Sequence, residues 1–203
     1  MAKRLLLLRH APVAAQHAGR LIGSTDVPLA VLGEAESQRL ADRVARWMPQ
    51  RCFSSPMQRC RQTAEAVAAG LPLHVDADLR EIDFGRCECR TFAEAAAEDP
   101  GLSDRWAAFT ADFGFPGGEK LESFLGRVRA AADRLAHAEA STVLAVTHGG
   151  VIRAMICHLL GLEARHYVAF DVPYAAIAVI DLFAGKGVLK TLERPDAAEV
   201  GHG

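Results

Sequence analysis

Five residues of this chain have side chains suited to phosphoryl transfer: Arg9, His10, Arg59, Glu81 and His148. Two guanidinium groups can neutralise a phosphate dianion, and a neutral imidazole can attack phosphorus to form a phosphohistidine. Nearby positive charge lowers the pKa of a histidine, which keeps His10 neutral near pH 7. Glu81 can protonate the leaving alkoxide and then deprotonate the water that clears the intermediate. Because the arginines and His148 can stabilise the equatorial oxygens, we expect neither a metal nor another cofactor.

Both candidate histidines follow strands that the sequence predicts to be buried. Residues 3–10 read KRLLLLRH, so four consecutive leucines lead into Arg9 and His10. Residues 142–147 read TVLAVT and are followed by His148. Uninterrupted apolar runs of this length are typical of strands covered on both faces. Since ligands bind at the carboxyl ends of strands in open α/β sheets, we expect His10 and His148 to share a pocket.

Arg59 is expected near the start of a helix over 57–69. Ser55 and Pro56 precede it and suit the N-cap and the first helical position. The N–H groups of a helix start and an arginine together form a good anion site. Arg61 lies about 200° around the helix from Arg59, so both cannot point into one pocket. We therefore assign Arg61 to an ion pair with a carboxylate.

Strands and helices alternate along the rest of the chain, and no linker or repeat divides it. This alternation predicts a single α/β domain spanning 1–203. A polar region at about 91–115, punctuated by Gly and Pro, indicates a lid-like helical insertion. Further helices are predicted over 34–48, 91–98, 102–113, 121–135 and 151–160, further strands over 51–54, 73–75, 174–182 and 188–193, and a frayed tail over 195–203.

Composition is that of an ordinary globular protein. Half of the 203 residues are hydrophobic, 24% are charged, and the net charge is −2. Such a balance argues against proteins that wrap nucleic acid or bind anionic membranes. The leucine run is too short to span a membrane and no cleavage site follows it, so we expect a cytoplasmic protein. Five scattered cysteines favour reduced thiols over a disulfide framework or a structural metal.

The chain resembles the histidine phosphatase superfamily, also called phosphoglycerate-mutase-like. The resemblance rests on six ordered blocks: LLLLRHAPV at 5–13, GRLIGSTDVPL at 19–29, SSPMQRCRQTAE at 54–65, LREIDFG at 79–85, PGGE at 116–119 and VTHGGVIR at 146–153. It implies a three-layer α/β/α sandwich with a mixed, mostly parallel sheet. It also implies that His10 is phosphorylated and that Glu81 serves as acid and base. In such a site Arg9, Arg59 and His148 hold the phosphoryl group.

Candidate substrate-binding residues lie mainly in the long loop that follows His10. They are Gln16, Arg20, Gly23 and Ser24, together with Gly149 beyond the second histidine. Long loops at strand ends usually carry function. Surface or structural positions are assigned to the other histidines, which are His17, His74, His137, His158, His166 and His202.

Four departures from the family pattern bear on substrate choice more than on the basic chemistry. Ala11 stands where glycine usually follows the nucleophile, so its Cβ is expected to crowd the phosphate or restrict the backbone. Gln16 replaces a common asparagine, and Lys120 replaces a usual serine. Residues 87–90 read CECR where many members have Trp-Glu-Gly-Leu.

Within this family we expect a hydrolase rather than a phosphoglycerate mutase. A chain of 203 residues leaves little room for the extra segments with which the mutases exclude water. The blocks look most like the α-ribazole-phosphate phosphatase branch, which acts in cobalamin synthesis. General phosphomonoesterases and sugar-phosphate phosphatases share the same blocks, so these remain alternatives.

Ala11 prompts an alternative of another class, a catalytically degenerate module that binds phospho-ligands without turnover. A phosphoprotein phosphatase would need an open site, and the insertion at 91–115 argues against one if it roofs the pocket. The expected partner is a small phosphomonoester substrate, and the protein is expected to be a monomer or a homodimer.

Overall fold

Six strands form one sheet at the centre of the protein. The strands are β1 (Lys3–Arg9), β2 (Arg51–Ser54), β3 (Leu73–Val75), β4 (Thr142–Thr147), β5 (Ile177–Phe183) and β6 (Lys186–Glu193). Their order is β3-β2-β4-β1-β5-β6, in which β3, β2, β4 and β1 run parallel while β5 and β6 are each antiparallel to the preceding strand. The sheet is therefore mixed and mostly parallel, as predicted.

The computed structural model describes residues 3–68, 70–184 and 186–195. His202, the residue Ala69 at the end of a predicted helix, and the predicted tail from 196 onward lie outside the described residues.

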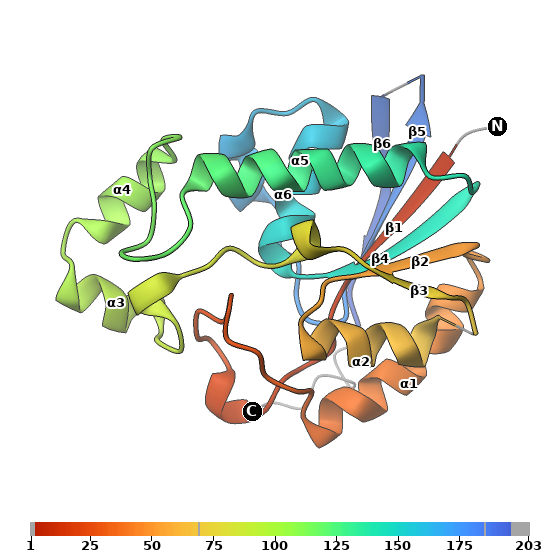
Figure 1. Ribbon diagram of the computed structural model, residues 1–203, viewed down its shortest axis with the longest axis horizontal. Coiled ribbons are helices and arrows are strands. Elements are labelled where there is room, and N and C mark those ends of the chain that lie inside the picture. The colour runs from red at the N-terminus through yellow and green to blue at the C-terminus, as the bar shows by residue number, and fades with distance from the viewer. Residues whose placement is uncertain (1–2, 69, 185, 196–203) are drawn as a thin grey trace.

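Helices cover both faces of the sheet. They are α1 (Val31–Ala45), α2 (Gln58–Val67), α3 (Phe92–Glu98), α4 (Leu102–Ala108), α5 (Leu121–His137) and α6 (Gly149–Leu160), with short 3₁₀ turns η1 (Ala15–His17), η2 (Ala77–Leu79), η3 (Gly85–Cys87) and η4 (Ala164–Ala169). Figure 1 shows α5 and α6 on one face and α1 and α2 on the other. This is the expected three-layer arrangement. None of the described helices combines the length and apolar character needed to cross a bilayer.

The leucine run of β1 is buried on both faces of the sheet. Leu5 and Leu7 pack in the core beneath α5 and α6, whereas Leu6 and Leu8 pack in the core against α1 and α2. All four side chains are fully buried. Because side chains alternate along a strand, one uninterrupted apolar run supplies both cores. The prediction of a doubly covered strand is confirmed.

The predicted cap of α2 is wrong. The helix begins at Gln58, and Met57 occupies the N-cap position without a side-chain hydrogen bond. Pro56 consequently lies before the helix. Ser55 has another partner, because its Oγ lies 2.9 Å from Nε2 of His148. Its side chain belongs to the candidate site instead of the helix terminus.

Several other boundaries differ from the prediction where the backbone turns left-handed. Positive φ values at Met48, Phe109 and Ala175 interrupt regular structure. The helix predicted over 34–48 spans 31–45, the helix predicted over 102–113 ends at 108, and the strand predicted over 174–182 spans 177–183. A side chain at positive φ gives no signal in hydrophobic periodicity, so the sequence pattern missed these breaks.

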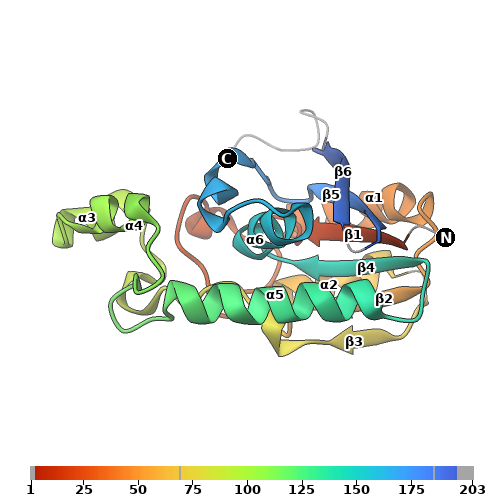
Figure 2. The same ribbon diagram turned by 90° about the horizontal axis from the view of Figure 1, so that it is seen from above.

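Helices α3 and α4 form a small projection beyond the end of the sheet. Figure 2 shows them past the carboxyl ends of β1 and β4. Thr91 caps α3 in a reciprocal capping box with Glu94. The backbone of Arg20 pairs with that of Thr91 in an isolated β-bridge, which joins the loop after β1 to the base of the projection.

Candidate active site

The ends of β1 and β4 place two histidine rings side by side. The His10 N–H donates to the Thr147 carbonyl at 3.0 Å, which joins the residue after β1 to the end of β4. The ring centroids of His10 and His148 lie 5.3 Å apart in an edge-to-face arrangement. Both rings are buried. The structure thus brings together the two strand-end histidines.

His10 presents an unprotonated nitrogen. Its Nδ1 lies 2.8 Å from the carbonyl oxygen of Ala11. Because a carbonyl oxygen only accepts, Nδ1 carries the proton and the lone pair is left on Nε2. Burial, then the charges of Arg59 and Arg9, lower the pKa of His10 well below its usual 6.5. At pH 7 the His10 imidazole is therefore neutral, with a free lone pair on Nε2.

Ala11 fits without distorting the backbone. Its φ is not positive, so the position does not require glycine. Its N–H donates to Thr63 Oγ1 at 3.1 Å, and that hydroxyl donates to the Arg59 carbonyl at 2.8 Å. The methyl group is fully buried and does not line the recess beside His10. The structure shows no backbone strain at Ala11, and the effect of its methyl group on a bound phosphate stays a prediction.

Arg9 is held by two neighbours near the end of the sheet. Its Nη1 donates to the Val172 carbonyl at 2.7 Å. Its guanidinium carbon lies 4.0 Å from the ring centroid of Tyr174, within cation–π distance. The same tyrosine ring lies 5.3 Å from that of His10. Tyr174 therefore orients Arg9 and packs beside His10, although the sequence analysis assigned it no role.

Arg59 is almost fully buried on α2. Its Nη1 donates to the Thr25 carbonyl at 2.9 Å, and its Nη2 donates to the carbonyls of Ile22 and Gly23 at 3.3 and 3.0 Å. The loop over 22–25 therefore fixes the guanidinium plane. Its Nε remains without a partner.

Two unpaired donors flank the neutral imidazole. Among buried side-chain nitrogen and oxygen atoms of the described residues, only three lack a hydrogen-bond partner, and two of these are the Nε atoms of Arg9 and Arg59. The third, Nε1 of Trp47, belongs to a residue packed against the core beneath α1 and α2. A buried donor without a partner is costly, and an anion between the two arginines would supply acceptors.

Glu88 fixes the loop that holds Arg59. Its carboxylate accepts from the backbone N–H groups of Gly23, Ser24 and Thr25 at 3.0–3.2 Å, and from the Thr25 hydroxyl at 2.6 Å. It also accepts from the N–H of Phe84 at 3.0 Å. Five donors thus converge on this side chain, four of them from a loop 63–65 residues earlier in the chain. The sequence analysis noted Glu88 only within the CECR departure.

His148 lies in a buried polar contact at the start of α6. Its Nε2 is 2.9 Å from Ser55 Oγ and 3.4 Å from Cys60 Sγ. Burial, followed by the charge of Arg59, lowers the pKa of His148 well below 6.5. Burial also raises the pKa of the Cys60 thiol to about 12, so that group stays protonated.

Glu81 is held against the first turn of α6. Its Oε2 accepts from the Gly150 N–H at 2.9 Å. A Cβ at Gly150 would lie 2.3 Å from Glu81 Oε1, so only glycine allows this approach. From α5, Arg127 donates to the Glu81 carbonyl at 2.9 Å and pairs with Glu119 at 2.7 Å. The Glu81 carboxylate is therefore positioned by two helices.

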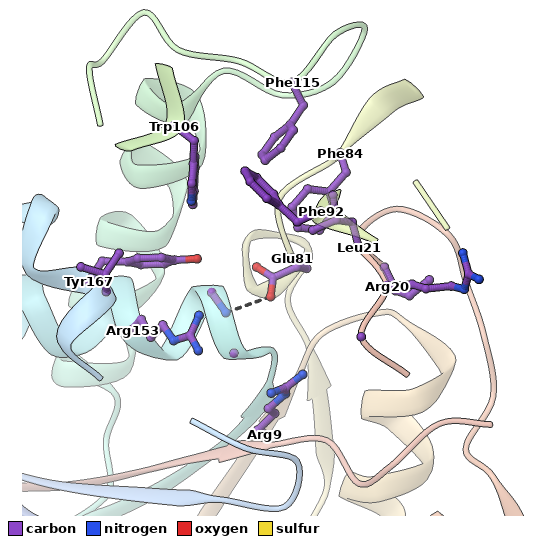
Figure 3. A pocket seen from close by; sticks show the side chains of 15 residues that line it. Arg9, Arg20, Leu21, Glu81, Phe84, Phe92, Trp106, Phe115, Arg153 and Tyr167 are labelled. Carbon is purple, nitrogen blue, oxygen red and sulfur yellow. Dashed lines mark hydrogen bonds between the residues drawn. The ribbon is translucent and has the colours of Figure 1, made fainter. Parts of the chain in front are cut away.

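These groups surround a recess that continues into a larger cavity. The recess, of about 40 Å³, is lined by Arg9, His10, Arg59, Glu81, His148 and Tyr174, among others. All five residues predicted to carry the chemistry therefore meet there. The adjoining cavity, of about 580 Å³, shares Arg9 and Glu81 with the recess (Figure 3).

The candidate substrate-binding residues divide into two groups. Arg20 and Gly149 line the larger cavity. Gly23 and Ser24 do not, because the first packs against Glu88 and the Ile82 carbonyl while the hydroxyl of the second donates to Asp83.

Gln16 also lies outside the cavity lining, with an exposed side chain. Its carbonyl accepts from Nε of Arg20 at 2.9 Å. Through this backbone contact, Gln16 contributes to holding the Arg20 side chain.

The sequence analysis missed the outer lining of the cavity. Tyr167 follows α6, and Arg153 lies on it, one turn beyond Gly149. Most of the rest is aromatic or aliphatic, and includes Leu21, Phe84, Phe92, Trp106 and Phe115. Aromatic residues are usual in cores, so the only signals were the family blocks that include Leu21, Phe84 and Arg153. No group of three or more His, Cys, Asp or Glu able to hold a metal occurs among the described residues.

Comparison with known proteins agrees with this arrangement. The model of the histidine phosphatase superfamily (branch 1) matches residues 5–195. An adenosylcobalamin/alpha-ribazole phosphatase of Salmonella typhimurium is 31% identical over 195 residues, covering 93% of this chain and 95% of that protein. The crystal structure of the alpha-ribazole phosphatase from Shigella flexneri superposes with a TM-score of 0.82 at 27% identity, covering 93% and 95% of the two chains.

Another relative is about twice as long as this chain. The bifunctional protein Rv2228c of Mycobacterium tuberculosis is 36% identical over 187 residues, which are 89% of this chain. The chain spans about half the length of that protein. Because the family match runs from β1 through β6, this chain belongs to the histidine phosphatase superfamily, branch 1.

Proposed function

We propose that this protein hydrolyses phosphomonoesters through a phosphohistidine on Nε2 of His10. One observation carries the proposal: the neutral imidazole shares a recess with Arg9 and Arg59, whose buried Nε donors have no partner. A phosphoryl group in the recess supplies acceptors to both. No metal is part of this proposal, because the guanidinium groups can stabilise the charge that develops on the equatorial oxygens.

The reaction takes place in two displacements. In the first, the lone pair of His10 Nε2 forms a bond to phosphorus while the bond from phosphorus to the ester oxygen breaks. Protonated Glu81 gives its proton to the leaving alkoxide. In the second, Glu81 takes a proton from water, the resulting oxygen attacks phosphorus, and the N–P bond breaks. Inorganic phosphate leaves, and His10 and protonated Glu81 are regenerated.

The test is hydrolysis of p-nitrophenyl phosphate by the purified protein and by His10→Ala. We expect turnover without added metal that is lost in the variant, whereas His137→Ala, an exposed change on α5, retains it. Mass spectrometry of a trapped phosphoenzyme should locate the phosphoryl group on His10. Phosphate binding without turnover would instead support the degenerate binding module, and a label on another side chain would overturn the mechanism.

For the natural substrate we propose α-ribazole 5′-phosphate, a nucleotide whose base is a flat aromatic ring. The support is the aromatic lining of the cavity by Phe84, Phe92, Trp106 and Phe115, together with the name of the Salmonella relative. Stacking of a base on aromatic side chains contributes about 1–3 kcal/mol. The kcat/KM for this nucleotide should therefore exceed that for ribose 5-phosphate by about tenfold or more. Equal values would favour a broad sugar-phosphate phosphatase.

The insertion over 91–115 is proposed to act as the roof of this site. Phe92, Trp106 and Phe115 line the cavity from its side, and Trp106 packs on Phe115 with ring centroids 5.5 Å apart. A roof of this kind favours small phosphomonoesters over phosphorylated protein side chains. Hydrolysis of a phosphotyrosine protein at a rate matching that of α-ribazole 5′-phosphate would contradict it.

A further inference from the structure

The cavity changes in character with distance from the sheet. Figure 3 shows Arg9 nearest the strand ends, Arg153 and Glu81 at an intermediate level, and Phe84, Phe92, Trp106 and Phe115 furthest out. A phosphate group at Arg9 therefore places the next atoms of its ester beside Arg153 and Glu81. The apolar part of a ligand reaches the aromatic residues only beyond that level.

Arg153 is held in place with its guanidinium toward the cavity. It lies on α6, and its Nε donates to the Phe170 carbonyl at 2.8 Å. Its guanidinium carbon is 5.4 Å from the ring centroid of Tyr167, within the range of a cation–π contact. Figure 3 shows the terminal nitrogens directed into the cavity. The Phe170 carbonyl takes Nε, and the Tyr167 hydroxyl is a further hydrogen-bonding neighbour of the guanidinium.

Arg153 differs from the other arginines that line the cavity. Arg20 pairs with Glu94 at 3.1 Å and donates to the carbonyls of Gln16 and Cys89. Arg9 and Arg20 both also line the recess beside His10, whereas Arg153 does not. Among the described residues, no carboxylate oxygen lies within 4 Å of an Arg153 nitrogen. The Arg153 guanidinium is half-buried and has N–H groups without a carboxylate partner, so oxygen atoms of a bound ligand would stabilise it.

We propose that Arg153 is a specificity-determining residue that donates hydrogen bonds to the hydroxyl oxygens of a sugar attached directly to the phosphate. This inference rests on the proposed phosphomonoesterase function. The fork of N–H groups suits two neighbouring oxygens, as in a vicinal diol. A phosphate, a pentose and a flat ring then occupy the three levels of the cavity in turn.

The test compares ribose 5-phosphate, 2-deoxyribose 5-phosphate and p-nitrophenyl phosphate as substrates of the wild type and of Arg153→Met. We expect the wild type to prefer ribose over deoxyribose by about tenfold in kcat/KM, since the deoxy sugar lacks one hydroxyl oxygen and hydrogen bonds to charged groups are among the stronger ones. Arg153→Met should remove that preference. It should also lower kcat/KM for ribose 5-phosphate about tenfold more than for p-nitrophenyl phosphate, chiefly through KM.

Two further variants keep the test sharp. Arg153→Lys retains a charge but not the fork, so it should keep only part of the preference. Arg129→Met removes an exposed arginine of α5 and should leave all three substrates unaffected. Thermal unfolding verifies that each variant is folded, and the ribose-to-deoxyribose ratio of the wild type tests the inference even if Arg153→Met does not fold.

The outcomes separate the inference from the proposed function. Turnover by the wild type with no preference between the two sugars overturns the inference alone. Equal loss on every substrate in Arg153→Met also overturns it, since Arg153 would then act on the phosphate or on Glu81. Absence of turnover on all three substrates refutes the phosphomonoesterase function, and with it this inference.

Discussion

At the scale of single residues, burial and nearby arginines decide the state of the two histidines. Burial is the largest cause of the lowered pKa of both His10 and His148, and the charge of Arg59 is the next. The carbonyl of Ala11 then selects which nitrogen of His10 holds the proton. An ordinary histidine thereby becomes a neutral base with its lone pair directed away from the backbone.

Gly150 sets how closely Glu81 can approach α6. Gly150→Ala would place a Cβ 2.3 Å from Glu81 Oε1 and force the carboxylate to move. We expect kcat for p-nitrophenyl phosphate to fall by at least tenfold. A well-positioned general acid and base contributes about 10²–10⁴-fold to a rate, and displacement of Glu81 would lose part of that contribution. Gly126→Ala is the matched control, because a Cβ there meets nothing within 4 Å. Equal activity in the two variants would show that Glu81 needs no such placement.

Arg59 and Arg61 differ in environment although they lie two residues apart. Arg59 is 1% exposed beside His10, whereas Arg61 is exposed and pairs with Glu65 at 3.9 Å. Arg59→Ala should abolish measurable inhibition by inorganic phosphate and lower kcat/KM by about 10² or more, since it removes a buried charged donor. Arg61→Ala should change kcat/KM less than twofold, because surface pairs contribute about 0–1 kcal/mol. The reverse result would reject this assignment.

At the scale of elements, two clamps position the reactive groups. The loop over 22–25 lies between the carboxylate of Glu88 and the guanidinium of Arg59. Glu88, which follows η3, therefore fixes the position of the Arg59 side chain on α2 through this loop. In the second clamp, Arg127 of α5 donates hydrogen bonds to the carbonyls of Asp78 and Glu81, and so joins α5 to the segment that carries Glu81. Each clamp is a charged side chain holding backbone groups of an irregular segment.

Glu88→Gln tests the first clamp. An amide has only one acceptor oxygen and brings its own donors toward the N–H groups of Gly23, Ser24 and Thr25. The loop and Arg59 should lose their fixed geometry, and KM for p-nitrophenyl phosphate should rise about tenfold or more while His10 remains neutral. Steady-state kinetics and the inhibition constant of inorganic phosphate measure this.

Glu65→Gln, an exposed control on α2, should match the wild type. A KM unchanged in Glu88→Gln contradicts the clamp.

At the scale of the whole molecule, the site lies at the carboxyl ends of β1 and β4, between the hydrophobic cores on the two faces of the sheet. The alternating leucines of β1 bind both helical layers together, so the strand that carries Arg9 and precedes His10 is also the centre of the fold. Burying two imidazoles at this junction makes folding depend on pH.

Lowered pKa values of His10 and His148 predict a loss of stability in acid. The unfolded chain binds protons at both residues below about pH 6.5, and the native state does not, so the free energy of unfolding falls as pH falls below that value. Each histidine contributes a slope of about 1.4 kcal/mol per pH unit. Urea unfolding from pH 7.5 to 5 measures this slope.

Comparison with single variants isolates the contribution of each ring. His10→Gln and His148→Gln should each reduce the slope of the unfolding free energy against pH by the contribution of one histidine. His137→Gln, at an exposed position, should leave that slope unchanged. A slope that is the same in all four proteins would mean that the buried histidines take up protons in the native state.

The sequence by itself determined the elements that carry the candidate site. The leucine run and TVLAVT specified β1 and β4, because a continuous apolar segment can be buried only in the middle of a covered sheet. Helical periodicity separated Arg59 from Arg61. Four of the five residues with suitable chemistry lie at or next to the end of a strand or near the start of a helix, whereas Glu81 lies in an irregular segment and was recognised by its family block. Their meeting in one recess followed from the rule that parallel strands share an end.

Only the tertiary structure decided what surrounds those residues. Tyr174 and Glu88 lie outside the helices and strands and contact groups brought close by folding. Arg153 lies on a predicted helix, but the Phe170 carbonyl that holds it is brought there by the fold. The cap assigned to Ser55 was wrong because a distant partner, His148, takes its hydroxyl. Local propensity reports on neighbours along the chain, whereas hydrogen-bond partners and cavity walls depend on where loops cross in space, which no local period encodes.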